Sequence, residues 1–352
     1  MHVLYEDPFR KERIEVKTPV EMKVDIQKLR VEAGIPDYLD TADFQSKKLV
    51  AAIWISRHIS QIDENIHRKR NGAPISTALF GGAAFRLHCP SLNKRHTGLY
   101  RSIKDIDILV SKKDGQDFAS LLCRADETLG NMFLHRITYS DKQFNLMRAG
   151  ERYRLTTISD VGHDGVLVPG ILEIFADKLT FCHEFVLTDE IKQAHENYFT
   201  VGIENLILLK TQFIKRIPRS ELSSEYEYRV MGDYDKSTAL IGMEDKDMRD
   251  VAAAVLDHEI GKGPDRLNID KLGVKLLEDW KLWKTCTMNL TNIYKNLSSV
   301  MKKFAVSQED TSKIHDRLGA ILDALNTRFR PKKPFLTFSN KQWWQDVEEQ
   351  QR

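Results

Sequence analysis

Apolar and polar residues follow two periods along the chain, which divide it into a mixed first part and a helical second part. Apolar residues recur at helical spacing over residues 46–70, which predicts an amphipathic helix with a basic end. A short apolar run over residues 75–80, the pair Gly81 and Gly82 and a second apolar stretch then follow. This order is typical of a strand, a tight turn and the start of a helix.

The remaining elements of the first part are also indicated by periodicity. Residues 105–110 alternate as a strand does, with two acids on one face, and a helix is expected over residues 116–129. Further strand-like runs occupy residues 133–139, 152–158 and 171–175. Because strands and helices mix, we predict an α/β or α+β domain with a mixed sheet and flanking helices.

Helical periodicity dominates after residue 200. Helices are expected over residues 203–217, 246–258, 274–303 and 310–328. Pro218 and the polar residues 219–238 predict a mobile loop, and residues 261–264 predict a break between helical units. The second part is therefore expected to form a helical C-terminal region.

The length of 352 residues favours two domains or slightly more. The expected division is an N-terminal arm over residues 1–45, a catalytic domain over 46–200, a helical extension that completes the cleft over 201–262, and a helical domain over 263–352.

Composition excludes several classes of protein. Hydrophobic residues make up 41% of the chain and charged residues 30%, unlike a disordered chain or a coiled-coil rod. Lys and Arg number 53 against 51 Asp and Glu, so net charge neither requires nor excludes a nucleic-acid partner. The four cysteines lack the spacing of a zinc site or a disulfide framework, and no apolar run is long enough for a membrane span. The start of the chain is charged rather than signal-like, so we expect a soluble cytoplasmic protein without a membrane partner.

Asp105 and Asp107 are the first candidates for chemistry. Residues i and i+2 of a strand project from one face, so both carboxylates could share Mg²⁺ with the phosphate oxygens of a nucleotide. An isolated Asp-x-Asp is more often an exposed strand with its polar residues pointing outward. Gly81 and Gly82 change this balance, because a strand–turn–helix unit offers backbone N–H groups to phosphates. A simple tight turn would also explain the two glycines.

The segments FGGAAFRLH and RSIKDIDILV resemble the signature of the DNA polymerase β-like nucleotidyltransferase superfamily. They are most similar to the AbiEii-type and minimal nucleotidyltransferase toxins of prokaryotic toxin–antitoxin systems, in which an Arg lies shortly before the Asp-x-Asp. Arg101 and Lys104 stand in those places. The glycine pair is farther from Asp105 than in compact members, and Ile103 stands where a Thr is common. The resemblance covers residues 46–260 and implies the nucleotidyltransferase fold.

The resemblance also implies a third carboxylate, on a neighbouring strand, that completes the metal site and acts as a base toward the attacking hydroxyl. Glu173 is the best candidate. Asp177 is the second, because it shares the strand parity of Glu173 if the strand extends that far, and Asp160 is the third. Alternatively, Glu173 faces solvent on an edge strand.

Lys210 lies within an apolar stripe of the helix expected over residues 203–217. The stripe consists of Ile203, Leu206, Ile207, Phe213, Ile214 and Ile217. The Lys210 ammonium could enter a cleft and neutralise a triphosphate, as the resemblance implies, or its stem could extend out of the packed face to solvent. In the first case, Lys210→Ala should weaken NTP binding with little loss of stability.

Two further groups of charges have two interpretations each. The toxins carry a basic residue followed by Asp-x-x-Asp on a later helix, and Lys246, Asp247 and Asp250 fit that pattern. The two acids could equally be N-terminal helix acids that face the helix dipole. A basic segment before Asp105 is either a solvated loop or a patch for the phosphates of an NTP or RNA. Its residues are Lys94, Arg95, His96, Arg101 and Lys104.

We therefore predict a metal-dependent nucleotidyltransferase that moves a nucleoside monophosphate from an NTP to an acceptor hydroxyl. Asp105, Asp107 and Glu173 would be catalytic and would bind two Mg²⁺ ions. The expected nucleotide-binding residues are Gly81, Gly82, Arg101, Lys104, Lys210 and Asp247. The resemblance implies an acceptor such as the 3′ end of tRNA or a protein side chain, and a cognate antitoxin if the chain is a toxin. The alternative is a catalytically inactive nucleotidyltransferase-like protein that binds nucleic acid or acts as a scaffold.

Overall fold

The computed structural model describes residues 2–6, 13–17, 75–94, 97–103, 105–124, 135–139, 142–161, 167–196, 200–263, 265–332 and 342–346. The chain divides into two compact units, each assembled from three segments. Unit 1 contains Met1–Leu87, Ser102–Leu179 and Val186–Val201, and unit 2 contains His88–Arg101, Thr180–Phe185 and Gly202–Arg352. The helix expected over residues 46–70 and the side chains of Arg95, His96 and Lys104 lie outside the described residues. The finer domain boundaries stay a prediction.

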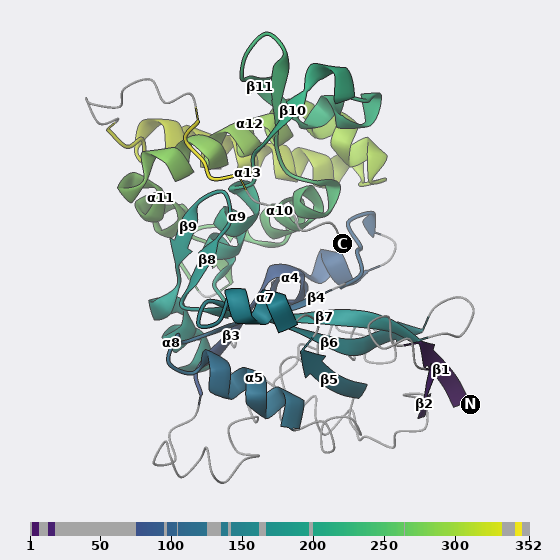
Figure 1. Ribbon diagram of the computed structural model, residues 1–352. Helices are drawn as coiled ribbons and strands as arrows, with labels where there is room; N and C mark the ends of the chain where they lie inside the picture. The colour runs from purple at the N-terminus through teal and green to yellow at the C-terminus, as the bar shows by residue number, and fades with distance from the viewer. Residues whose placement is uncertain are drawn as a thin grey trace. The chain divides into compact units, whose positions relative to one another are not determined.

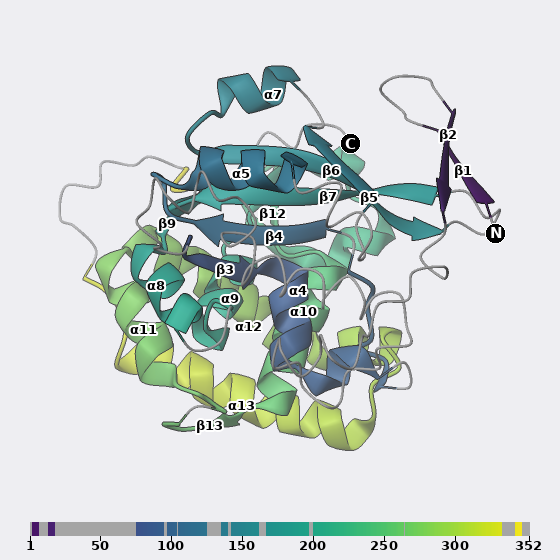
Figure 2. The same cartoon turned by 90° about the horizontal axis from the view of Figure 1, so that it is seen from below.

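Unit 1 contains a five-stranded mixed sheet with the strand order β3-β4-β7-β6-β5, which can be followed in Figure 2. The strands are β3 (Thr77–Phe80), β4 (Asp105–Val110), β5 (His135–Tyr139), β6 (Arg152–Val161) and β7 (Leu167–Ala176). Strands β4 and β7 pair in parallel, and the β3–β4, β6–β7 and β5–β6 pairs are antiparallel. The mixed sheet expected from the sequence is confirmed. A separate antiparallel pair is formed by β1 (His2–Glu6) and β2 (Arg13–Lys17).

The alternation in β4 sorts its side chains onto two faces of the sheet. Ile106, Ile108 and Val110 are buried on one face, where α5 (Gly115–Arg124) packs (Figure 1). The acids of β4 lie on the opposite face and are half-buried. The short helix α7 (Lys142–Met147) lies on that second face, because its Phe144 packs against two arginine side chains of β6. The other helices in the described part of unit 1 are α4 (Gly81–His88), which ends at the unit boundary, and α8 (Thr188–Glu196).

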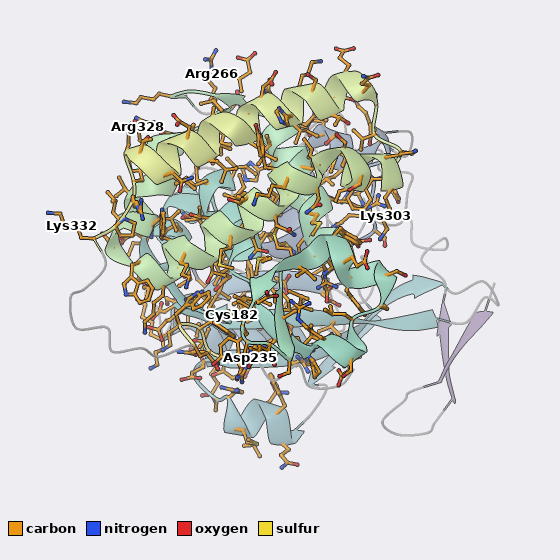
Figure 3. The ribbon with its side chains drawn as sticks, turned by 90° about the horizontal axis from the view of Figure 1, so that it is seen from above. Cys182, Asp235, Arg266, Lys303, Arg328 and Lys332 are labelled. Atoms are coloured by element: carbon orange, nitrogen blue, oxygen red, sulfur yellow. The ribbon has the colours of Figure 1, made fainter. Side chains whose placement is uncertain are left out.

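Unit 2 is mostly helical, as expected for the C-terminal region. Its described residues form the helices α9 (Ile203–Thr211), α10 (Asp245–Asp257), α11 (Ile269–Glu278), α12 (Trp280–Lys303) and α13 (Gln308–Thr327), with the short 3-10 helices η3 (Pro90–Asn93), η5 (Arg219–Glu221) and η6 (Ser224–Arg229). Helices α12 and α13 pack along each other (Figure 3). Among the described helices, none combines the length and the apolar character that crossing a membrane would require.

The helix expected over residues 203–217 is wrong in its second half. Helix α9 ends at Thr211, and β10 (Lys215–Pro218) follows it. Strand β10 forms a three-stranded antiparallel sheet with β12 (Thr238–Ile241) and β11 (Val230–Asp233), in the order β10-β12-β11. The segment 219–238, expected to be a loop, contains η5, η6 and β11.

The physical reason is a set of tertiary hydrogen bonds from Asn289 of α12. Its amide nitrogen donates to the carbonyls of Thr211 at 2.8 Å and Phe213 at 2.7 Å, and its amide oxygen accepts from the N–H of Met243 at 3.0 Å. These bonds replace the helical hydrogen bonds that α9 would need to continue. Helical periodicity alone cannot show them.

The helix expected over residues 274–303 is divided into α11 and α12. Asp279 has an extended backbone between them, and its carboxylate accepts from the N–H groups of Lys281 at 2.8 Å and Leu282 at 3.2 Å. Asp279 therefore caps the N-terminus of α12 and ends the preceding helix. The break expected over residues 261–264 lies between β13 (Glu259–Ile260) and β14 (Arg266–Leu267).

Candidate functional site

Asp107 lies at the centre of the polar face of the sheet in unit 1. Strand register pairs Asp107 with Phe80 of β3 on one side and with Glu173 of β7 on the other. Directly paired residues of neighbouring strands project from the same face. Asp105, Asp107 and Glu173 therefore share one face, as the sequence led us to expect.

Gly81 brings the turn after β3 against this face. Its φ of 64° is in the left-handed region, and a Cβ atom placed on it would overlap the carboxylate of Asp107. Only glycine combines that backbone conformation with so close an approach. The expected strand–turn–helix unit is confirmed, and its backbone lies directly beside the carboxylate of Asp107.

Glu173 is buried, with 4% of the residue exposed, and two arginines of β6 bind its carboxylate. Arg154 Nε donates to Glu173 Oε1 at 2.6 Å, and Arg152 Nη2 donates to Glu173 Oε2. Strand β7 lies inside the sheet, between β4 and β6. The alternative of a solvent-facing Glu173 on an edge strand is therefore wrong.

The other two candidates for the third carboxylate are placed differently. Strand β7 ends at Ala176, and Asp177 follows it with a left-handed φ of 60°. Asp177 therefore does not share the strand parity of Glu173, on which its candidacy depended. Asp160 lies on β6, and its side chain is outside the described residues.

The carboxylates on this face differ in how well they fit a divalent cation. Asp105 and Asp107 offer hard carboxylate oxygens from positions i and i+2 of one strand face, which fits Mg²⁺. Both oxygens of Glu173, in contrast, accept hydrogen bonds from arginine. In the described part of the chain, no three acidic, His or Cys side chains gather into a metal-binding group. The aspartate pair therefore fits a cation, whereas the set of three carboxylates is not assembled in this arrangement.

Lys210 belongs to a buried cluster of four charges in unit 2. Its ammonium donates to Asp247 Oδ1 at 2.6 Å and lies 3.3 Å from Asp250 Oδ2. Arg101 Nε lies 2.8 Å from Asp250 Oδ1. The two acids are three residues apart on α10 and both meet Lys210 of α9. Lys210 therefore lies in an apolar stripe because buried carboxylates bind its ammonium.

The pKa values in this cluster follow from burial and pairing. Burial raises the pKa of Asp250 above its usual value, although Arg101 and Lys210 oppose this effect. Burial acts in the same direction on Asp247, but the neighbouring Lys210 lowers the pKa of Asp247 overall. Burial would lower the pKa of Lys210, but the two carboxylates raise it overall. The Lys210 ammonium is therefore charged and already neutralised by its neighbours.

Among the other charged residues predicted from the sequence, Lys246 and Lys94 lie outside this cluster. Lys246 forms an exposed ion pair with Glu244 at 2.9 Å. Asp247 lies in the first turn of α10, so its interpretation as an N-terminal helix acid also holds. Lys94 is exposed just after η3.

Sequence reasoning missed Arg152 and Arg154. Their alternate positions in a predicted strand were the available signal, since such residues share a face. The sequence does not show which strand lies beside them, and their partner Glu173 comes from that strand.

Comparison with known proteins adds little to this geometry. No family model matches the chain, and no curated protein matches it in sequence. A structure from H. pylori, provisionally described as a nucleotidyltransferase, is 14% identical, and the match covers 82% of this chain and 99% of that chain with a TM-score of 0.37. The structure of JHP933 from Helicobacter pylori is 13% identical, and the match covers 82% and 96% with a TM-score of 0.30. The mixed sheet, flanking helices and helical C-terminal region agree with the α/β (α+β) fold class expected from the sequence.

Proposed function

We propose that the chain is a metal-dependent nucleotidyltransferase that transfers a nucleoside monophosphate from an NTP to an acceptor hydroxyl and releases pyrophosphate. The approach of Gly81 to the carboxylate of Asp107 carries the proposal. It places the backbone of a strand–turn–helix unit beside an Asp-x-Asp strand. Backbone N–H groups that can donate to phosphate oxygens are therefore adjacent to carboxylates that can bind a cation.

Each residue of the site has a defined task in this proposal. Asp105 and Asp107 would hold Mg²⁺, which when bound supplies positive charge to the phosphates at the reacting centre. Backbone N–H groups at the start of α4, around Gly81 and Gly82, would donate to the triphosphate and orient it. These interactions fix the position of the reacting phosphorus before the acceptor arrives.

Lys210 and Arg101 of the charged cluster in unit 2 could bind a nucleotide only after a rearrangement of their ion pairs. Because Lys210 and Arg101 already pair with Asp247 and Asp250, a phosphate would have to displace a carboxylate to bind either of them. Nucleotide binding by these residues and by Lys104 stays a prediction. The acceptor (an RNA 3′ end or a protein side chain), a second Mg²⁺ ion, a toxin role with a cognate antitoxin, and a cytoplasmic location are proposals that rest on the motif resemblance.

One observation favours the alternative function. Glu173, the expected third carboxylate, is bound by two arginines, as it would be in a nucleotidyltransferase-like scaffold without catalysis. We favour the enzyme because the aspartate pair and the glycine turn are both intact.

The experiment that separates the two functions is a labelling assay. The protein would be incubated with each radiolabelled NTP, Mg²⁺ and total cellular RNA or protein. The wild type should label one of these fractions, and Asp107→Ala should lower incorporation by roughly 100-fold or more, because a ligand to the cation at the reacting centre is lost. Asp316→Ala, which removes an exposed aspartate of α13, serves as the matched control. Equal labelling by wild type and Asp107→Ala would exclude this site as the source, and absence of labelling by the wild type would favour the scaffold.

A further inference from the structure

The arginine pair on β6 lies on the same sheet face as the proposed cation site. Strand register pairs Arg154 with Glu173 and Glu173 with Asp107, so the three side chains lie in one row across β6, β7 and β4. Arg152 lies two residues before Arg154 on that face. A group bound by the arginines would therefore lie beside the aspartate pair.

The chemistry of this pair matches phosphate as well as carboxylate. A guanidinium group presents planar N–H donors, and the same donors bind carboxylate and phosphate oxygens. Two arginines share one carboxylate here, so the group Arg152, Arg154 and Glu173 retains one excess positive charge. The Glu173 carboxylate therefore occupies the place in which the two arginines could bind an oxyanion from outside the protein.

The arginines are oriented by contacts other than Glu173. The Arg152 guanidinium stacks on the ring of Phe175 at 4.5 Å, and that of Arg154 stacks on Phe144 at 4.4 Å. Asn145 holds the backbone of Arg154, since its side chain accepts from the N–H at 2.8 Å and donates to the carbonyl at 3.0 Å. The arginines would therefore keep their orientation if Glu173 were displaced.

Two features indicate that the pair is incomplete without a ligand. Arg152 Nε is buried and donates to no acceptor in the part of the chain that the structure describes. The side chains of Arg152 and Arg154 are 27% and 19% exposed, against 5% for Glu173. Solvent therefore reaches the arginines more readily than it reaches the carboxylate that they bind.

We propose that Arg152 and Arg154 form a binding site for a phosphate oxyanion, and that Glu173 occupies this site until the oxyanion displaces it. Glu173 is then a positioning residue in the free protein and not a standing cation ligand. The consequence of this displacement for catalysis rests on the proposed function. The displaced Glu173 would lie beside Asp107 without its arginine partners. The oxyanion belongs either to the triphosphate of the NTP or to the backbone of a polynucleotide acceptor.

Competition between Glu173 and the ligand predicts effects of opposite sign. Binding of tripolyphosphate and of a single-stranded RNA oligonucleotide would be measured by calorimetry on the full chain, in EDTA and without NTP. Glu173→Gln should bind one of these probes roughly tenfold more tightly, because the internal competitor loses its charge. The double variant Arg152→Gln/Arg154→Gln should bind the same probe at least roughly tenfold more weakly, because charge-assisted hydrogen bonds are lost.

Arg148→Gln is the control for loss of positive charge, because Arg148 is 57% exposed and its removal takes away one of the two charges lost in the double variant without touching the pair. Tighter binding of tripolyphosphate by Glu173→Gln assigns the site to the NTP, and tighter binding of RNA assigns it to the acceptor. Unchanged or weaker binding of both probes by Glu173→Gln overturns the proposal, even if the double arginine variant fails to fold. Since neither cation nor turnover is involved, this outcome is independent of the labelling assay that tests the proposed function.

Discussion

Gly81 and Gly150 both have a left-handed backbone but differ in their surroundings. Gly81 has a φ of 64° and faces the Asp107 carboxylate, whereas Gly150 has a φ of 83° and nothing within 4 Å of a built Cβ atom. A side chain at Gly150 would cause only backbone strain. A side chain at Gly81 would cause the same strain and would also overlap a carboxylate.

Gly81→Ala should therefore abolish labelling and lower the free energy of unfolding by about 2 kcal/mol or more, since strain and overlap add. Gly150→Ala should cost only about 1 kcal/mol and leave labelling intact. Denaturant unfolding and the labelling assay measure both effects. Equal behaviour of the two variants would show that the approach of Gly81 to Asp107 has no functional consequence.

Lys210 is paired with two carboxylates of α10. Lys210→Met should lower the free energy of unfolding by about 3 kcal/mol, because Asp247 and the fully buried Asp250 lose a cationic partner. This differs from the small loss of stability expected from the sequence. Combining Lys210→Met with Asp250→Asn should recover part of the loss, as measured by denaturant unfolding.

Lys246→Met is the control for Lys210, because Lys246 is 49% exposed and its pair with Glu244 contributes at most about 0.5 kcal/mol. If Lys210→Met kept full stability but weakened NTP binding, the sequence-based role would be right. The structural role assigned to the ion pairs would then be wrong.

At the scale of elements, Asn289 determines where α9 ends. Asn289→Ala removes the partner of the carbonyls of Thr211 and Phe213 and of the N–H of Met243. Because buried polar groups without a partner are costly, we expect a loss of roughly 3 kcal/mol in the free energy of unfolding. Asn326→Ala should cost less than about 0.5 kcal/mol, because this exposed asparagine donates to the carbonyl of Leu322 in its own helix. A similar loss in both variants would contradict the role of Asn289.

The elements that the sequence predicted are those whose causes are local. Strand β4 has the predicted bounds, residues 105–110, because its alternation of apolar and acidic residues is complete within the strand. The end of α9 was not predictable, because the residue that fixes it, Asn289, is 78 residues from Thr211. Periodicity carries no information about a partner at that distance.

The candidate site divides in the same way. Asp105, Asp107 and the glycine turn follow from neighbouring residues, so the sequence indicated them correctly as parts of one strand and one turn. The binding of Glu173 by Arg152 and Arg154 depends on the pairing of β6 with β7, which only the assembled sheet defines. The sequence therefore placed Glu173 on the right face but did not show that arginines bind it.

At the scale of the molecule, His183 joins segments that are far apart in the chain. Thr285 of α12 donates to the carbonyl of Lys281 at 3.2 Å, and its oxygen accepts from Trp343 Nε1 at 3.0 Å. His183 Nε2 lies 2.9 Å from the same oxygen, so neutral His183 completes the group as a donor. Burial lowers the pKa of His183 from 6.5 to about 4.

This pKa predicts a pH dependence of stability. Between pH 6.5 and about 4 the unfolded chain binds a proton at His183 and the folded protein does not, so acid favours unfolding. The stability that His183 contributes should be present above pH 6.5 and fall by up to about 3 kcal/mol toward pH 4.

Denaturant unfolding at several pH values should show a smaller decrease in His183→Gln than in the wild type. His315→Gln is the control, because this ring stacks on Tyr294 and lies outside the group around Thr285. An identical profile for the wild type and His183→Gln would show that His183 is not the titrating group.

The interleaving of the two units also affects the newly made protein. The last segment of unit 1 ends at Val201, whereas Cys182 of unit 2 packs against Trp344. Ribosomes add roughly 5–20 residues per second, so Trp344 is added on the order of ten to thirty seconds after Val201. The sheet with Asp105 and Asp107 can form before that time has passed. The thiol of Cys182, hidden in the finished protein, is accessible to oxidants during that interval of synthesis.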